Sequence, residues 1–150
     1  LLSRRQRQMC IRDRYRNDME GGQTNEFRPL ILVAEDDDSN FKLIKAIIGK
    51  KCDIQWAKNG EEIVALFKEY GNEAKAILMD IKMPVMNGLD ATKIIRGENK
   101  EIPIIMQTAY AFSSDKENAM NAGASEVLVK PITLSILRNT LTKYFPELVW

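Results

Sequence analysis

The chain contains the stretch Leu30-Ile31-Leu32-Val33-Ala34-Glu35-Asp36-Asp37-Asp38, an apolar run followed at once by four acidic residues. A strand that is apolar at every position is covered on both faces, which is typical of a parallel sheet between two layers of helices. Side chains that directly follow such a strand lie at the carboxyl edge of the sheet, where open parallel sheets bind ligands. The stretch therefore predicts an α/β fold and the edge at which function is expected.

Four further apolar runs follow the first, with starts 22 to 28 residues apart, at residues 54–57, 76–79, 104–106 and 127–129. Between and after the runs, apolar residues recur at helical spacing, in the groups Leu43/Ile44/Ile47/Ile48, Ile63/Leu66/Phe67/Tyr70, Leu89/Thr92/Ile95, Ala119/Met120 and Leu134/Leu137/Leu141. Typical helix-start residues precede these groups, namely Asp38/Ser39, Asn59-Gly60, Asn87-Gly88, Ser114 and Thr133. The alternation predicts a (βα)₅ fold with a doubly wound, parallel, five-stranded sheet.

Polar residues follow four of the five predicted strands, namely Glu35-Asp36, Asp80, Thr108 (after Gln107) and Lys130. The second strand is followed only by Lys58 and Asn59. An outer position for that strand explains the difference. The expected order is therefore 2-1-3-4-5, which places the first and third strands side by side.

Carboxylates at two adjacent strand ends repel each other unless a cation lies between them. Hard oxygen ligands suit Mg²⁺, and a lysine with a nearby hydroxyl can hold the oxygens of a phosphoryl group. Taken singly, these residues have ordinary explanations: acids favour a helix N-terminus, lysines are usually solvated, and threonines often lie in turns. Their joint placement predicts an acidic metal pocket beside groups that bind a phosphoryl group.

The composition sets limits on function. The 150 residues suit one globular domain, and 22 basic against 21 acidic residues give no reason to expect direct contact with nucleic acid or membrane. The chain has no histidine, which excludes Cys/His zinc sites, Ser-His-Asp catalysis and a phosphohistidine on this chain. Cys10 and Cys52 make no disulfide framework, and no apolar run approaches the roughly 20 residues that span a bilayer. We expect a cytoplasmic protein, or the cytoplasmic part of a larger one.

Residues 1–27 differ from the remainder. They hold six of the nine arginines, interspersed with four acidic residues, and show no sustained periodicity. This predicts a disordered arm or linker before a domain of residues 28–150, with a basic nucleic-acid arm as the weaker interpretation. Residues 8–14 resemble peptide translated from sequencing adapters, so the arm could be non-native sequence.

Four strings, in order across residues 30–144, resemble the response-regulator receiver domain, and the first and third look most like receivers of hybrid histidine kinases. They are Leu30-Ile31-Leu32-Val33-Ala34-Glu35-Asp36-Asp37, Leu78-Met79-Asp80-Ile81-Lys82-Met83-Pro84-Val85-Met86-Asn87-Gly88, Gln107-Thr108-Ala109-Tyr110-Ala111 and Val129-Lys130-Pro131. The resemblance implies a flavodoxin-like fold. It also implies a phosphoacceptor in a two-component phosphorelay, which assists its own phosphorylation and is not an enzyme in the usual sense.

The resemblance further implies roles for single residues. Asp80 would be the phosphoacceptor, and Mg²⁺ or Mn²⁺ would be held by Asp36 and Asp80 directly, by the main-chain carbonyl of Lys82, and by Glu35 through water. Thr108 would be the switch hydroxyl. Lys130 would pair with the phosphate, beside a cis bond to Pro131. Pro84 and Gly88 would shape the loop beyond Asp80.

The implied donor is a phosphohistidine on a histidine kinase or histidine phosphotransfer domain, and a homodimer could form through the face made by the fourth helix, fifth strand and fifth helix. One position departs from the family, because Val127 replaces a frequent Tyr or Phe whose rotamer couples to the threonine. Lys82 and Tyr110, two positions beyond Asp80 and Thr108, are expected to flank the entry of hydrolytic water.

Two alternatives stay open at this point. Asp36-x-Asp38 followed by Thr108 and Lys130 imitates the motif order of haloacid-dehalogenase-type phosphatases, although no acidic pair follows the last strand and no cap domain fits the length. The other alternative is a phosphorylation-independent interaction module with a vestigial pocket.

Overall fold

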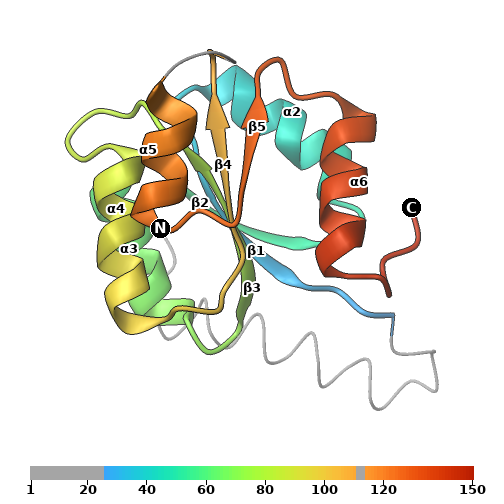
Figure 1. The fold of residues 1–150 in the computed structure, drawn as a ribbon. Coiled ribbons are helices and arrows are strands. Elements are labelled where there is room, and N and C mark those ends of the chain that lie inside the picture. Colours follow the sequence, from blue (N-terminus) through green and yellow to red (C-terminus); the bar gives the residue numbers. More distant parts are fainter. Residues whose placement is uncertain (1–25, 111–113) are drawn as a thin grey trace.

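The computed structural model describes residues 26–110 and 114–150, where five parallel strands form one sheet in the order β2-β1-β3-β4-β5 (Figure 1). The strands are β1 (Leu30–Ala34), β2 (Asp53–Ala57), β3 (Ala74–Asp80), β4 (Ile104–Thr108) and β5 (Glu126–Val129). The predicted fold class and strand order are confirmed. β3 is longer than predicted at both ends, and it includes Asp80 as its last residue.

Helices alternate with the strands, and those in the described residues are α2 (Asp38–Ile48), α3 (Gly60–Tyr70), α4 (Gly88–Glu98), α5 (Ser114–Ala122) and α6 (Leu134–Tyr144). Side chains of Asn59, Asn87 and Thr133 cap α3, α4 and α6 by accepting a backbone N–H of the first turn, as their position in the sequence predicts. The cap of α2 is one residue earlier than expected, because the Asp37 carboxylate accepts from the Asn40 N–H at 2.9 Å.

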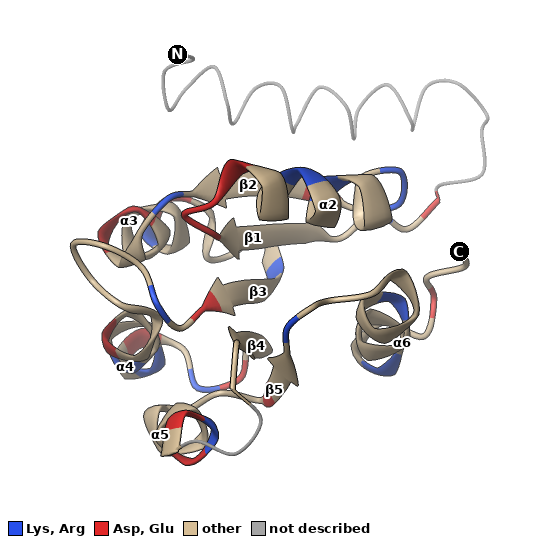
Figure 2. Ribbon diagram, turned by 90° about the horizontal axis from the view of Figure 1, so that it is seen from above, with Lys and Arg blue, Asp and Glu red and all other residues tan. Residues whose placement is uncertain are grey.

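The helices cover both faces of the sheet, with α3, α4 and α5 on one side and α2 and α6 on the other (Figure 2). Alternate residues of β1 enter the two cores: Leu30, Leu32 and Ala34 pack under α3, whereas Ile31 and Val33 pack under α2 and α6. All five residues of β1 are buried, which is why the run is apolar throughout.

Three residues predicted on buried helix faces are exposed instead. Leu43 is 46% exposed, and Met120 and Leu134 are each 48% exposed. A helix presents only a stripe to the sheet, and in α2 that stripe is filled by Ile44, Ile47 and Ile48. The apolar spacing therefore predicts each helix correctly but overestimates the width of its buried face.

Residues 1–25 lie outside the described residues, so the arm stays a prediction. Glu26 and Phe27, which the sequence assigns to that arm, contact the domain: Glu26 pairs with Lys51, and the Phe27 ring centroid lies 6.1 Å from that of Phe145. Among the described residues, none of the helices combines the length and the apolar composition that a membrane crossing needs.

Candidate functional site

Three carboxylates gather at the carboxyl edge of the sheet. Asp80 is the last residue of β3, and Glu35 and Asp36 directly follow β1 (Figure 2). β1 and β3 pair in parallel up to Ala34 and Met79, so their ends are adjacent. One ligand atom from each of the three carboxylates lies within 4.8 Å of the others. The predicted juxtaposition of these acids follows from the strand order.

Lys130 joins the acids from the other side of β4. Its Nζ lies 2.9 Å from Asp80 Oδ2 and 3.5 Å from Glu35 Oε2. The Lys130 backbone N–H donates to the Thr108 carbonyl at 2.7 Å, and the bond to Pro131 is cis, as the sequence resemblance implied. Lys130 follows β5 directly, so its side chain reaches across the end of β4 to meet Asp80.

The electrostatics of this cluster centre on Glu35, which is completely buried. The pKa of Glu35 is raised to about 7, first by burial and then by the charge of Asp80, with the Lys130 ammonium acting in the opposite direction. Burial alone would lower the pKa of Lys130, but the hydrogen bond to Asp80 and the charges of Asp80 and Glu35 outweigh it and raise this pKa. The Lys130 ammonium thus faces the carboxyl groups of Asp80 and Glu35 at close range.

The donor set fits a hard divalent cation. Glu35 Oε1 accepts the Asp37 N–H at 3.2 Å, whereas the buried Oε2 accepts no hydrogen bond from the described residues. Asp36 is exposed and lies close to both Glu35 and Asp80. Three carboxylates this close together, with Glu35 Oε2 held within the described ranges only by the 3.5 Å ion pair to Lys130, are the ligand chemistry that Mg²⁺ or Mn²⁺ prefers. The part expected for the Lys82 carbonyl stays a prediction.

Thr108 reaches the same edge but does not join the ion-pair cluster. It is the last residue of β4 and is buried. Its hydroxyl oxygen accepts the Tyr110 N–H at 3.2 Å and makes no hydrogen bond to Asp80 or Lys130. Beyond it, the Lys82 ammonium lies 4.8 Å from the centroid of the Tyr110 ring, so the two residues expected to flank the entry of water are in contact.

The loop beyond Asp80 is tightly constrained, as predicted for Pro84 and Gly88. A Cβ on Gly88 would lie 2.2 Å from the Asp80 carbonyl oxygen, so only glycine fits there. The Met86 N–H donates to the Pro84 carbonyl at 2.7 Å, with Val85 between them at a φ of 67°. A positive φ is unusual for a β-branched residue, and the sequence does not announce it.

The sequence did not predict that Trp56 contacts the acidic turn after β1. The second strand was expected to leave the site alone, yet the indole N–H of Trp56 in β2 donates to the main-chain carbonyl of Glu35 at 2.8 Å. The Trp56 ring stacks on Phe41 of α2, with centroids 4.0 Å apart and planes inclined by 2°. The signal that could have indicated this contact is a large aromatic residue, Trp56, next to the last position of β2.

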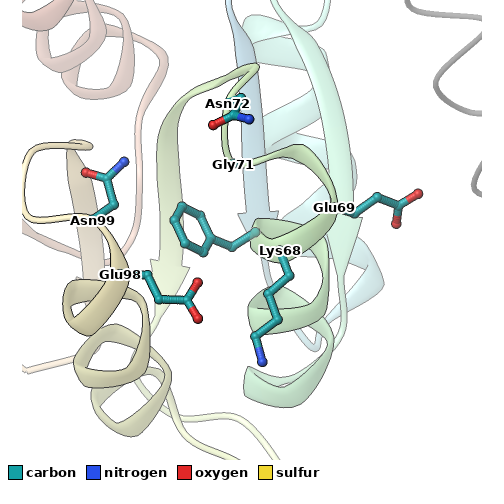
Figure 3. A pocket seen from close by; sticks show the side chains of 7 residues that line it. Lys68, Glu69, Gly71, Asn72, Glu98 and Asn99 are labelled. Atoms are coloured by element: carbon teal, nitrogen blue, oxygen red, sulfur yellow. The ribbon is translucent and has the colours of Figure 1, made fainter.

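A second pocket lies at the opposite edge of the sheet, between the C-terminal ends of α3 and α4 (Figure 3). It encloses about 240 Å³ and is lined mainly by polar residues. Figure 3 shows Glu98 extending from α4 toward α3, whereas Glu69 points away from α4. This pocket is remote from Asp80, which ends β3 at the other edge.

Comparison with known proteins identifies the family. Residues 31–142 match the response regulator receiver domain. The chain belongs to this family. Among curated relatives, hybrid signal transduction histidine kinase I of Dictyostelium discoideum is 38% identical over 129 residues, which are 78% of this chain and 7% of that protein. The histidine-protein kinase BarA of Escherichia coli is 33% identical over 119 residues, 77% of this chain and 13% of that protein. The receiver thus spans a small part of these relatives.

Solved structures agree. The receiver domain of sensor histidine kinase PA1611 from Pseudomonas aeruginosa, described with magnesium in its active site cleft, is 32% identical with a TM-score of 0.73, covering 80% of this chain and 99% of that one. The Ssk1 receiver of Saccharomyces cerevisiae, solved with the histidine phosphotransfer protein Ypd1, is 28% identical with a TM-score of 0.73, covering 81% and 93%. These matches confirm the resemblance read from the sequence.

The family match sets aside the phosphatase alternative. The geometry agrees, because the second acid of the Asp36-x-Asp38 pattern turns away from the acidic cluster. The Asp38 side chain is 67% exposed and its Oδ1 lies 3.9 Å from Lys58 Nζ.

Proposed function

We propose that this chain is the phosphoacceptor of a His-to-Asp phosphorelay, in which Asp80 accepts a phosphoryl group from a phosphohistidine of a histidine kinase or histidine phosphotransfer domain. One observation carries the proposal: the Asp80 carboxylate lies 2.9 Å from Lys130 Nζ and shares a 4.8 Å cluster with Glu35 and Asp36. Membership in the receiver family supports the same role.

In the proposed transfer, an Asp80 carboxylate oxygen attacks phosphorus. The P–N bond to the donor imidazole breaks, and its electron pair leaves with the imidazole nitrogen. The Lys130 ammonium, already paired with Asp80, would take up the phosphoryl oxygens. Asp36, Asp80 and the Lys82 carbonyl would hold Mg²⁺ or Mn²⁺ directly, and Glu35 would do so through water. The charge of the cation would offset that of the phosphoryl group. The chain is thus a substrate that assists its own phosphorylation.

The output of the proposed switch runs through Thr108. Its hydroxyl donates to the Tyr110 carbonyl at 3.5 Å, and in the phosphorylated state it would donate to a phosphoryl oxygen instead, which would shift Tyr110 and α5. Residue 127 is a valine, partly buried against the core, so an aromatic rotamer has no part in the proposal. We expect the face of α5, β5 and α6 to change, and a second copy could pair there.

A groove beside the acidic cluster suits the donor domain. It lies between α2 and the segment after β5, encloses about 300 Å³, and is lined by Leu43, Ile44, Lys130, Pro131 and Ile132 among others. Leu43 is 46% exposed there, outside the stripe of α2 that packs on the sheet. We assign this groove to a histidine phosphotransfer domain, because an apolar surface next to Lys130 would bring a bound phosphohistidine to Asp80. The neighbouring Ssk1 receiver was solved with such a protein.

Phosphorylation with acetyl phosphate and Mg²⁺, followed by location of the modified residue, tests the central claim. We expect one aspartyl phosphate at Asp80 and none in Asp80→Asn. Modification at another residue, or equal labelling of Asp80→Asn, contradicts the proposal. Absence of labelling would favour the remaining alternative, an interaction module that works without phosphorylation.

A second experiment tests the docking groove. Leu43→Glu should slow transfer from a phosphorylated phosphotransfer domain about tenfold, as for loss of an interface anchor, and leave labelling by acetyl phosphate unchanged. Ile94→Glu is the matched control, because Ile94 is 41% exposed on α4. Equal effects of the two substitutions would remove the groove from the proposal.

The larger context belongs to the same proposal. We place the chain in the cytoplasm, either as a single-domain regulator or as the receiver of a hybrid histidine kinase. The second option is supported by relatives such as BarA, of which the matching region is 13%.

A further inference from the structure

The peptide that joins Glu35 to Asp36 lies just beyond the end of the β1–β2 ladder. The Glu35 N–H still donates to the carbonyl of Ala57, the last residue of β2, at 2.9 Å, although β1 has already ended at Ala34. In a strand, the N–H and C=O of one residue point to the same side, so the Glu35 carbonyl also faces β2. Asn59, which could supply the next backbone donor, instead begins α3 as its cap.

The Trp56 side chain supplies the missing donor. Its indole N–H meets the Glu35 carbonyl at 2.8 Å, in place of a ladder hydrogen bond. That carbonyl belongs to the same planar peptide as the Asp36 nitrogen, so the hydrogen bond fixes the direction in which the chain enters Asp36. The following N–H, that of Asp37, is held by Glu35 Oε1 at 3.2 Å.

The indole is itself held in place. Phe41 of α2 stacks on it almost parallel, at 4.0 Å between centroids, and the Lys58 ammonium lies 4.8 Å from the Trp56 ring centroid. The stack leaves the indole little freedom to turn its N–H away from Glu35. A helix, an edge strand and the acidic turn are therefore joined through one side chain.

We propose that Trp56 is a positioning residue of the acidic pocket, whose indole N–H sets the orientation of the Glu35–Asp36 peptide and thereby the affinity for a divalent cation. The inference rests on the proposed function, because it presupposes that the pocket binds Mg²⁺. Its physical basis is preorganisation: ligands held in place before binding lose less freedom when the cation arrives.

The test compares two tryptophans of the same chain. Trp56→Phe keeps an aromatic ring against Phe41 and removes the N–H donor together with one of the two fused rings. Trp150→Phe is the matched control, because its indole N–H also makes one hydrogen bond, to Thr142 Oγ1 at 2.9 Å, outside the acidic pocket. Calorimetric titration with Mg²⁺ should give a Kd about fivefold higher for Trp56→Phe, the usual effect of one hydrogen bond, and an unchanged Kd for Trp150→Phe.

Two further measurements test the role of Trp56 independently of the Trp56→Phe variant. The indole N–H resonance of Trp56 in the unmodified chain should shift on saturation with Mg²⁺ while that of Trp150 does not, and Phe41→Leu should also raise the Kd. Wild-type Kd in Trp56→Phe, or an unmoved Trp56 resonance, overturns this inference and leaves the proposed function standing. If the unmodified chain does not bind Mg²⁺, both fail together.

Discussion

Helices α3 and α5 cover the same face of the sheet but are anchored very differently. α3 buries Ile63, Val64, Leu66, Phe67 and Tyr70 together with Gly60. α5 buries only Ala119 and Ala122, although the two helices are of similar length. Burial of large apolar side chains is the main stabilising term in a core, so α3 is held far more firmly than α5.

The difference in packing between α3 and α5 matches the roles proposed for the residues at the carboxyl edge of the sheet. The firmly packed part of the sheet, β1 and β3, carries the acids that must keep a fixed geometry. The loosely packed part follows β4, where Thr108 leads into α5. A segment with few buried apolar contacts moves at low free-energy cost, which a switch requires. Under the proposed function, the packing would separate the binding of the phosphoryl group from the response to it.

The largest expected effect is the difference in stability between alanine substitutions in α3 and in α5. Phe67→Ala in α3 should lower the free energy of unfolding by about 3–5 kcal/mol, because it leaves a cavity in the core. Met120→Ala in α5 should change it by less than about 0.5 kcal/mol, because Met120 is 48% exposed. Urea unfolding of both variants measures the contrast, and comparable losses would abolish it.

The next largest effect is the stabilisation expected from Mg²⁺ at the acidic cluster, which lies at the ends of the firmly packed strands β1 and β3. Mg²⁺ at 100 times its Kd should stabilise the fold by about 2.7 kcal/mol, because it binds the folded state and relieves repulsion between carboxylates on β1 and β3. Thermal unfolding with and without Mg²⁺ measures this. Asp36→Asn should largely remove the increment, and chelator should reverse it. An equal increment in Asp36→Asn would place the cation elsewhere.

A smaller effect concerns the hydrogen bonds that Arg96 makes just beyond the end of α5. Arg96 of α4 donates from Nε to the Gly123 carbonyl at 2.7 Å and from Nη2 to Ser125 Oγ at 3.2 Å, just beyond the end of α5. Arg96→Met should cost about 1–3 kcal/mol, because these acceptors lose a charged donor. Hydrogen exchange should accelerate in α5 and stay unchanged in α3. Equal acceleration in both helices would mean that Arg96 supports the whole fold rather than α5.

The smallest expected effect concerns Lys82 and Tyr110, which follow β3 and β4 and contact each other beyond Asp80 and Thr108. Tyr110→Ala and Lys82→Ala should each change the half-life of the aspartyl phosphate, because both side chains are expected to limit the entry of water. Their ammonium–ring contact should make the double substitution non-additive by about 0.5–1 kcal/mol. Decay of the phosphorylated protein measures both. Unchanged decay in Tyr110→Ala would contradict the role, and strict additivity would contradict the coupling.

Much of the fold could be predicted because its signals are local. Asn59, Asn87 and Thr133 cap helices through contacts within one turn, and the apolar runs mark strands covered on both faces. The exposure of Leu43 could not be predicted, since the helical spacing identifies an apolar face but not how much of it the sheet covers. The direction of the Thr108 hydroxyl, toward the Tyr110 N–H, depends likewise on how the next loop turns.

By itself, the sequence determined the family, the strand order and the residues of the acidic edge, because periodicity and motif spacing are short-range properties of the chain. Only the tertiary structure decided which of these residues touch. Lys130 and Asp80 are 50 positions apart and meet at 2.9 Å because only β4 separates β5 from β3 in the sheet. Trp56 reaches Glu35 because the β1–β2 ladder ends one donor too early. Such contacts depend on where strands stop, which no local pattern encodes.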